Sequence, residues 1–260
     1  MSLRLSIIGV ILAGGEGKRF RPLTYYIPKS MIPVGRSERP ILEFIILWMR
    51  KWSISDIIIL VGYKWRQITN YFGDGSRFNV KMKFVVDKHP YSNTGGALRR
   101  ALDLGLLDGY SDALVWYGDI IAPIKLGELI EKHYMSESDV TIAVSSNYKV
   151  PVGVVSIGRD MNILSMVEKP DLNLNANIGV LVLKISSLKR VLENSNLGFS
   201  FDIAGDLIPA MIRNGMKVKA YIHEDIWYDI GSIERYEKID HEKIEDLLEI
   251  NSSIPSYVYI

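Results

Sequence analysis

The chain contains no cysteine and only four histidines in its 260 residues. Without cysteine it can form no disulfide, use no thiol nucleophile and bind no zinc through thiolates. The histidines are scattered and lack the i, i+4 spacing of a metal-binding pair, which argues against a histidine metal site. The lack of cysteine is compatible with a reducing compartment, so we expect the protein to be cytoplasmic.

An excess of charge and long apolar runs are also missing. With 31 basic and 30 acidic residues the net charge is +1, so no global field would attract nucleic acid or an anionic membrane. The longest apolar runs have about eight residues, where a membrane-spanning helix needs about 20. The first run leads straight into glycines without a signal-peptide cleavage region. We therefore expect no nucleic-acid or membrane partner, and any anion site must be local.

The first half of the chain alternates apolar, β-rich runs with helical periods. Hydrophobic residues make up 48% of the sequence, a usual share for a globular protein. The β-α-β-α order predicts an α/β fold with a mostly parallel sheet covered on both faces. The expected strands are 6–13, 56–62, 81–86 and 112–119, and the expected helices are 40–52, 65–72, 94–106 and 127–134.

The second half changes to short strands with tight connections, which indicates antiparallel or mixed pairing. The expected strands are 139–146, 152–158, 163–170, 177–184, 217–223 and 226–229. The expected helices are 185–194, 201–214 and one polar amphipathic helix over 232–249.

A glycine-rich loop follows the first strand and reads GGEGKRFRPLT from Gly14. It matches neither the Walker A pattern nor the Rossmann fingerprint, since Gly17-Lys18 is followed by Arg19 and no glycine stands at the sixth Rossmann position. Glycines let backbone N–H groups approach an anion, and an arginine offers a planar fork for phosphate oxygens. A plain glycine turn with solvated lysines is the alternative on the loop alone.

The loop and the following PKSMIPVG, which contains Lys29, resemble the signature of the sugar-1-phosphate nucleotidylyltransferases. Ser30 departs from it, because the family usually has proline there. The resemblance implies a Rossmann-like nucleotidyltransferase fold, with a central, mostly parallel mixed sheet flanked by helices. Residues 1–240 would form the catalytic domain and residues 241–260 the end of its C-terminal helix and its tail. We expect none of the further domains that some relatives append.

The resemblance implies transfer of a nucleoside monophosphate from an NTP to a sugar 1-phosphate, with release of pyrophosphate. Arg19 and Lys29 would be catalytic. Mg²⁺ would be held by Asp119, which ends the strand VWYGD, and by Asp229 in WYDIGS. Carboxyl ends of parallel strands are where α/β sheets bind ligands. The predicted nucleotide-binding residues are Ala13, Gly14, Gly15, Gly17, Gly95 and Gly118.

The residues assigned to the sugar phosphate and to the base come from less specific sequence segments. By resemblance, the residues that bind the sugar phosphate are Gly153, Glu168, Lys169 and Asn177. Family members often read the base with Gln or Glu a few residues before the TGG segment. Here His89 and Asp87 are the only obvious polar candidates, so the base remains open.

Two longer segments favour the mannose-1-phosphate guanylyltransferase branch, with GTP and mannose 1-phosphate as substrates. They are VGYKWRQITNYFGDGSRFNV and IWYDIGSIERYEKI. Glucose-1-phosphate thymidylyl- or uridylyltransferase is the alternative. A non-catalytic regulatory paralogue that binds a sugar nucleotide is a second one, although such proteins typically lose the loop or metal residues. An aminoalcohol-phosphate cytidylyltransferase would share the loop but not the sugar segments. The apolar tail IPSYVYI offers a contact for a second copy, so a homo-oligomer is also considered.

Overall fold

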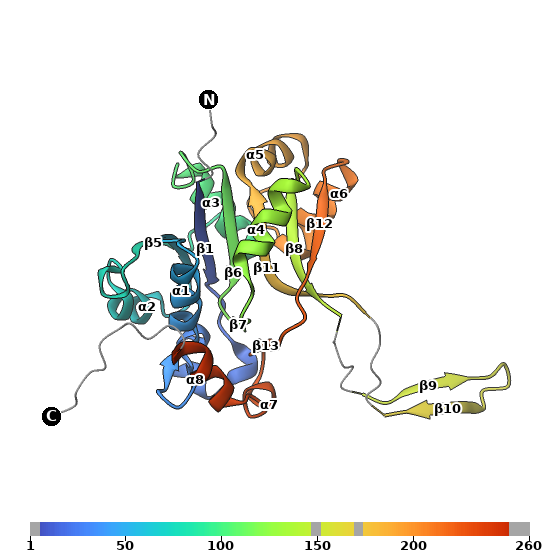
Figure 1. The fold of residues 1–260 in the computed structure, drawn as a ribbon. Coiled ribbons are helices and arrows are strands. Elements are labelled where there is room, and N and C mark those ends of the chain that lie inside the picture. The colour runs from blue at the N-terminus through green and yellow to red at the C-terminus, as the bar shows by residue number, and fades with distance from the viewer. Residues whose placement is uncertain (1–5, 147–151, 169–173, 250–260) are drawn as a thin grey trace.

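A seven-stranded sheet forms the centre of the protein in the computed structural model, which describes residues 6–146, 152–168 and 174–249 (Figure 1). The strand order is β12-β8-β11-β6-β1-β4-β5. All strands run parallel except β11, which is antiparallel to both neighbours, β6 and β8. This confirms the expected mixed, mostly parallel sheet. The strands are β1 (Ile7–Ala13), β4 (Asp56–Val61), β5 (Lys81–Val86), β6 (Asp112–Tyr117), β8 (Val140–Ser145), β11 (Ala176–Lys184) and β12 (Val218–Ile222).

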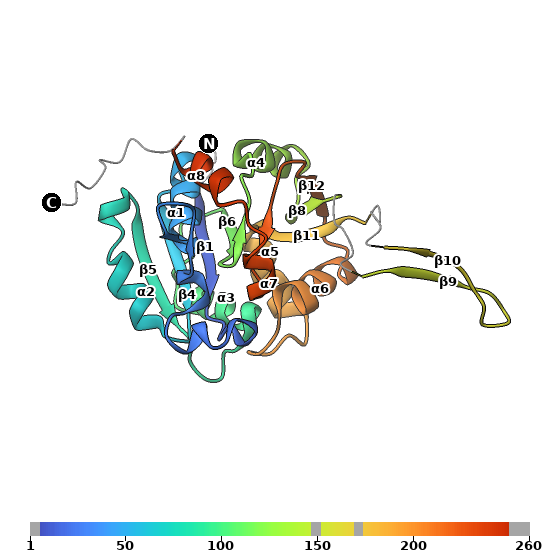
Figure 2. The same ribbon diagram turned by 90° about the horizontal axis from the view of Figure 1, so that it is seen from below.

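Helices cover both faces of this sheet (Figures 1 and 2). Ile11 of β1 belongs to a core cluster with α1, α2 and α4, whereas its neighbour Val10 belongs to a cluster with α3, α5 and α6. Because both faces are buried, the central strands are apolar throughout instead of alternating. The helices are α1 (Ile41–Lys51), α2 (Trp65–Phe72), α3 (Asn93–Asp103), α4 (Leu126–Met135), α5 (Ile185–Asn194), α6 (Ile208–Arg213), α7 (Ile233–Tyr236) and α8 (His241–Glu249).

Two of the expected strands form a separate antiparallel hairpin, which lies apart from the central sheet (Figures 1 and 2). It consists of β9 (Val154–Ile157) and β10 (Ile163–Val167). We call it the arm. All nine of its strand residues are exposed, and Leu164 is 70% exposed. A two-stranded hairpin with so much apolar surface is only marginally stable alone.

The C-terminal region differs from the sequence prediction. Instead of one helix over 232–249, the chain forms the short α7 and the separate α8. The second helix begins at its own cap, because the Asp240 carboxylate accepts a hydrogen bond from the N–H of Lys243 at 3.1 Å. Polar side chains of α8 then bind a loop near the N-terminus: Gly35 donates to His241 Nδ1 at 3.1 Å and Ser37 to Glu245 Oε2 at 3.0 Å.

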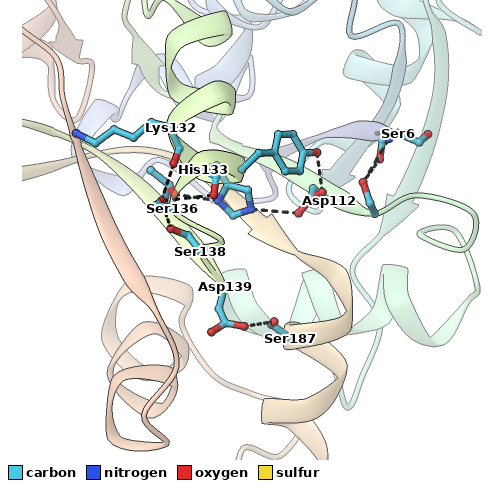
Figure 3. Close-up of polar contacts among 11 residues, drawn as sticks. Ser6, Asp112, Lys132, His133, Ser136, Ser138, Asp139 and Ser187 are labelled. Carbon is cyan, nitrogen blue, oxygen red and sulfur yellow. Dashed lines mark hydrogen bonds and ion pairs between the residues drawn. The ribbon is translucent and has the colours of Figure 1, made fainter. Parts of the chain in front are cut away.

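A buried polar network lies at the amino end of β6 (Figure 3). Asp112 accepts a hydrogen bond from Tyr134 at 2.7 Å and lies 3.2 Å from His133 Nε2, whose ring contacts Thr141 Oγ1 at 2.9 Å. Burial alone would raise the pKa of Asp112, but hydrogen bonds from His133, Ser111 and Tyr134 outweigh it and lower the pKa. The network joins α4 to β6 and β8 at the end of β6 opposite its carboxyl end. It therefore stabilises the sheet far from the site described next.

Four short strands complete the described part. They pair as β2 (Pro33–Val34) with β3 (Arg39–Pro40) and as β7 (Ile120–Ile121) with β13 (Tyr228–Asp229). Among the described residues, no helix combines the length and the apolar character needed to cross a bilayer.

Candidate active site

A cavity of about 640 Å³ opens at the carboxyl ends of β1, β4, β5 and β6. Eight of the residues predicted from the sequence line it, namely Ala13, Gly14, Gly15, Gly17, Arg19, Lys29, Gly118 and Asp119. The structure therefore brings together the glycine loop, the separate lysine and the end of β6. The cavity is also lined by Leu12, Glu16, Lys18, Ser30, Leu60, Asp87, Asn93, Thr94, Ala97, Tyr117, Asp202 and Gly231.

The glycine loop approaches the cavity with its backbone. A Cβ atom added at Gly15 would meet no atom within 4 Å, so this stretch is open to a ligand. Gly17 has φ +62°, and a Cβ there would lie 3.0 Å from both Lys29 Cβ and Thr24 Cγ2. The Thr24 hydroxyl donates to the Gly17 carbonyl at 3.0 Å. Glycine thus allows the loop to turn tightly against the segment that carries Lys29.

Lys29 and Asp119 form an ion pair at the cavity wall. Their side chains are only 14% and 30% exposed, so the pair is partly shielded from water. Gly118 fixes the backbone before the carboxylate: its N–H donates to the Leu12 carbonyl at 2.9 Å, and a Cβ there would lie 2.7 Å from that oxygen. The strand end therefore holds a carboxylate and a cation in contact at the cavity wall.

Asp229, the second predicted metal ligand, reaches this place through the β7–β13 ladder. It lies opposite Ile120, and the next N–H, of Ile230, donates to the Asp119 carbonyl at 2.9 Å. The ladder thus brings the backbones of Asp119 and Asp229, which are 110 positions apart in the chain, side by side. Asp229 does not itself line the cavity, and its carboxylate forms an ion pair with Arg235. Sequence reasoning assigned no role to Arg235.

Asp87 follows β5 on the opposite side of the glycine loop. A Cβ added at Gly14 would lie 2.9 Å from Asp87 Oδ2, so this carboxylate lies directly beside the loop. Burial raises the pKa of Asp87, and the positive charge of Arg100 partly counteracts this. Of the two candidates for reading the base, Asp87 lines the cavity and His89 does not.

The start of α3 contributes Thr94 to the cavity lining, and Gly95 lies behind it. Gly95 does not line the cavity: its N–H donates to the Phe201 carbonyl at 2.9 Å, and a Cβ there would collide with the Phe201 ring. Its glycine is explained by packing. The neighbouring Thr94 lines the cavity instead, and its hydroxyl donates to Asp202 at 2.6 Å. Asp202 also accepts from the N–H of Gly205 at 2.8 Å, and the D-x-x-G pattern was the sequence signal for this cap.

Among the described residues predicted for the sugar, Gly153, Glu168 and Asn177 do not line the cavity. Gly153 and Glu168 lie together next to the arm, since a Cβ at Gly153 would be 2.9 Å from Glu168 Oε2. Asn177 accepts a hydrogen bond from Gly179 N at 2.9 Å, where the pairing of β11 with β8 is irregular. Lys169 lies outside the described residues.

A family model described as nucleotidyl transferase matches residues 8–246. The chain belongs to this family. Curated relatives include a glucose-1-phosphate adenylyltransferase from Clostridium kluyveri, which is 27% identical over 95% of this chain and 69% of its own length. A UTP–glucose-1-phosphate uridylyltransferase from Synechocystis is 28% identical over 87% of this chain and 61% of its own length. The chain thus spans about two thirds of the length of these two relatives. Their names confirm the resemblance to sugar-1-phosphate nucleotidyltransferases.

Solved structures of this nucleotidyl transferase type have the same fold. A Bacillus anthracis protein assigned as a glucose-1-phosphate thymidylyltransferase has a TM-score of 0.71 at 21% identity, covering 92% of this chain and 95% of that one. HddC from Yersinia pseudotuberculosis, complexed with GMP-PN, has a TM-score of 0.65 at 26% identity, covering 90% and 97%. The relatives above are named for glucose 1-phosphate, so the mannose-1-phosphate branch stays a prediction.

Proposed function

We propose that the protein transfers a nucleoside monophosphate from an NTP to a sugar 1-phosphate, with GTP and mannose 1-phosphate as the best pair. The observation that carries the proposal is the contact of Lys29 with Asp119 at a cavity edged by the glycine loop. A cation, a carboxylate and open backbone N–H groups at the ends of parallel strands suit the binding of a nucleoside triphosphate.

The reaction asks for charge neutralisation and alignment more than for covalent chemistry. An oxygen of the sugar phosphate forms a bond to the α-phosphorus while the bond from that phosphorus to the bridging oxygen breaks. Pyrophosphate leaves, and no proton has to move because the attacking oxygen is already ionised. Lys29 would neutralise the charge that gathers on the α-phosphate, and Arg19 would hold the outer phosphates with its planar fork.

The residues fit a Mg²⁺ ion held jointly with the substrate. In residues 6–146, 152–168 and 174–249, no three His, Asp or Glu side chains gather as a ligand set. Mg²⁺ usually takes one or two carboxylates and completes its shell with water and substrate phosphates. Asp119 and Asp229, whose backbones are adjacent through the β7–β13 ladder, would supply these carboxylates. The ion would add neutralisation of the phosphate charge.

The chemistry of Asp87 supports guanine. An ionised carboxylate only accepts hydrogen bonds and has two oxygens to do so. The guanine edge offers two neighbouring donors, N1–H and the 2-amino group, whereas the other common bases offer no such pair. Asp87 beside Gly14 would read this edge at the inner end of the loop. The HddC structure complexed with GMP-PN, at 26% identity, is in keeping with a guanine nucleotide.

The sugar is supported by sequence resemblance alone. Glucose 1-phosphate with dTTP or UTP is the rival pair, and the names of the curated relatives favour glucose. Binding of a sugar nucleotide without turnover is the other rival. Arg19, Lys29 and Asp119 together at the cavity argue against this non-catalytic alternative.

The test is pyrophosphate release with Mg²⁺ over a grid of substrates. GTP, dTTP, UTP, CTP and ATP would each be combined with mannose, glucose, N-acetylglucosamine and galactose 1-phosphates. Release that needs both substrates, fastest with GTP and mannose 1-phosphate, is the expected result. Faster pyrophosphate release with glucose 1-phosphate would change the proposed substrates but not the enzyme class. Binding of a nucleotide sugar without pyrophosphate release from any substrate pair would favour the non-catalytic regulatory protein over the enzyme.

A further inference from the structure

Three charged side chains converge on Gly231, a residue that lines the cavity. A Cβ atom added there would lie 2.9 Å from Asp229 Oδ1 and 3.3 Å from Arg19 Nη2 and from Arg235 Nη1. Because both arginine nitrogens lie 3.3 Å from one point, they are at most twice that distance apart. Two guanidinium groups therefore lie close together beside the space proposed for the triphosphate.

The charges of this cluster do not balance. Arg235 forms an ion pair with Asp229. Within the described part of the chain, the Arg19 side chain forms no hydrogen bond or ion pair. The cluster thus contains two cations and one carboxylate, and that carboxylate is paired with Arg235 alone. The Lys29–Asp119 pair next to it is balanced one to one.

Under the proposed function, Asp229 turns to a divalent cation when the substrate binds. Arg235 then loses its counter-charge while Arg19 stays close by. Two neighbouring cations without a carboxylate between them repel each other, so an anion has to enter. The triphosphate that arrives with the cation supplies this anion.

We propose that Arg235 is a phosphate-binding residue of this site. In the empty protein it neutralises Asp229. When metal and triphosphate enter, it releases Asp229 to the cation and donates its N–H groups to the outer phosphates beside Arg19. The planar fork of arginine suits this exchange, because carboxylate and phosphate both accept two parallel hydrogen bonds from it.

A purely structural role is the rival explanation, in which Arg235 only ties Asp229 to α7. The two roles predict opposite changes in the affinity for metal alone when Arg235 is removed. If Arg235 competes with the metal for Asp229, its removal tightens the binding of metal alone and weakens the binding of phosphate. If Arg235 only positions Asp229, its removal weakens both.

The experiment compares the wild-type protein with R235Q, R235K and the control R190Q. Arg190 lies on α5, outside the cavity, and forms an ion pair with Asp139 at 3.0 Å. Like Arg235, it is an arginine paired with an aspartate. Titration calorimetry with inorganic pyrophosphate and Mg²⁺ measures phosphate binding, so no base or sugar needs to be known. Electron paramagnetic resonance of Mn²⁺ alone measures metal binding. Thermal melting of each variant checks folding.

We expect R235Q to bind pyrophosphate about 10- to 100-fold more weakly, the usual loss for a hydrogen bond between charged groups. Mn²⁺ alone should bind R235Q about two- to fivefold more tightly, because a partly exposed ion pair no longer competes. R235K should fall between wild type and R235Q for pyrophosphate, and R190Q should match wild type in both measurements.

Two results would overturn the proposal. A change in pyrophosphate affinity below threefold would remove Arg235 from phosphate binding, and a joint loss of Mn²⁺ and pyrophosphate affinity would leave it a structural role. The proposal rests on the proposed function, and the same experiment separates the two failures. If wild-type protein itself binds no pyrophosphate with Mg²⁺, the nucleotidyl-transfer function fails first. If wild type binds pyrophosphate and R235Q binds it equally well, only the role of Arg235 fails.

Discussion

Replacement of Lys29 by alanine tests the centre of the proposed site. The Lys29 ammonium contacts Asp119 at the cavity wall with only 14% of its side chain exposed. Removal of one preorganised charge donor to a transition state costs about 2.7–4 kcal/mol, which corresponds to a factor of about 10²–10³ in kcat. We expect K29A to lose kcat by this factor in pyrophosphate release with the best substrate pair.

Stability should account for little of this loss. The carboxylate of Asp119 remains 30% exposed and can be hydrated once its partner is gone. We expect K29A to lose less than about 1 kcal/mol in free energy of unfolding, the range for partly exposed ion pairs. Urea unfolding of the same preparation would separate a folding defect from a catalytic one.

A matched control is the pair formed by Lys189 and Asp108, whose charged atoms lie 3.3 Å apart outside the cavity. K189A removes a lysine from a carboxylate in the same way but should leave kcat within a factor of two or so. A tenfold or smaller loss of kcat in K29A would refute its assigned role. A loss of 10² or more in K189A would show that the assay reports general damage.

The remaining predictions concern a glycine, the base pocket and the buried network. G118A should lower the free energy of unfolding by about 1–3 kcal/mol in urea, because its Cβ would press on the Leu12 carbonyl, whereas G15A should change it by under about 0.5 kcal/mol. D87N should lower kcat/KM for GTP about 10- to 100-fold and for ATP much less, and equal losses would remove Asp87 from base reading. The pKa of Asp112 is lowered on folding, so its stabilisation should be lost as the pH falls below about 4. D112N should flatten that acid limb in urea unfolding and cost about 2–3 kcal/mol at pH 7.

Regular elements of this fold could be predicted closely because their periodicity is local. Helix 65–72 and helix 185–194 begin and end where the pattern placed them. The central strands were found because both of their faces are buried, which makes them continuous apolar runs between polar turns. The C-terminal prediction failed because the break depends on the cap at Asp240 and on contacts of α8 with a loop some 200 residues earlier.

The candidate site likewise contains residues that could be predicted from the sequence and residues that could not. The loop glycines and Asp119 could be predicted because strand ends and turns are visible in the sequence, and the structure places them at one cavity. Gly95 stays a prediction, and in the structure it packs against the Phe201 ring. A glycine needed beside a packed ring and a glycine needed beside a ligand look the same in a sequence. Asp202 and Arg235 were missed because their importance comes from partners far along the chain or from a short turn.

The ion pairs explain how such a site can stay folded when it is empty. Asp119 and Asp229 would repel each other and destabilise the strand ends if both stood unpaired beside the cavity. Lys29 and Arg235 neutralise them from within the protein. A metal–triphosphate complex carries both signs of charge, so it can take the carboxylates with its cation and the two basic groups with its phosphates. Binding then replaces two internal ion pairs by four contacts to the substrate complex, and neither a lone metal ion nor a lone triphosphate achieves this exchange.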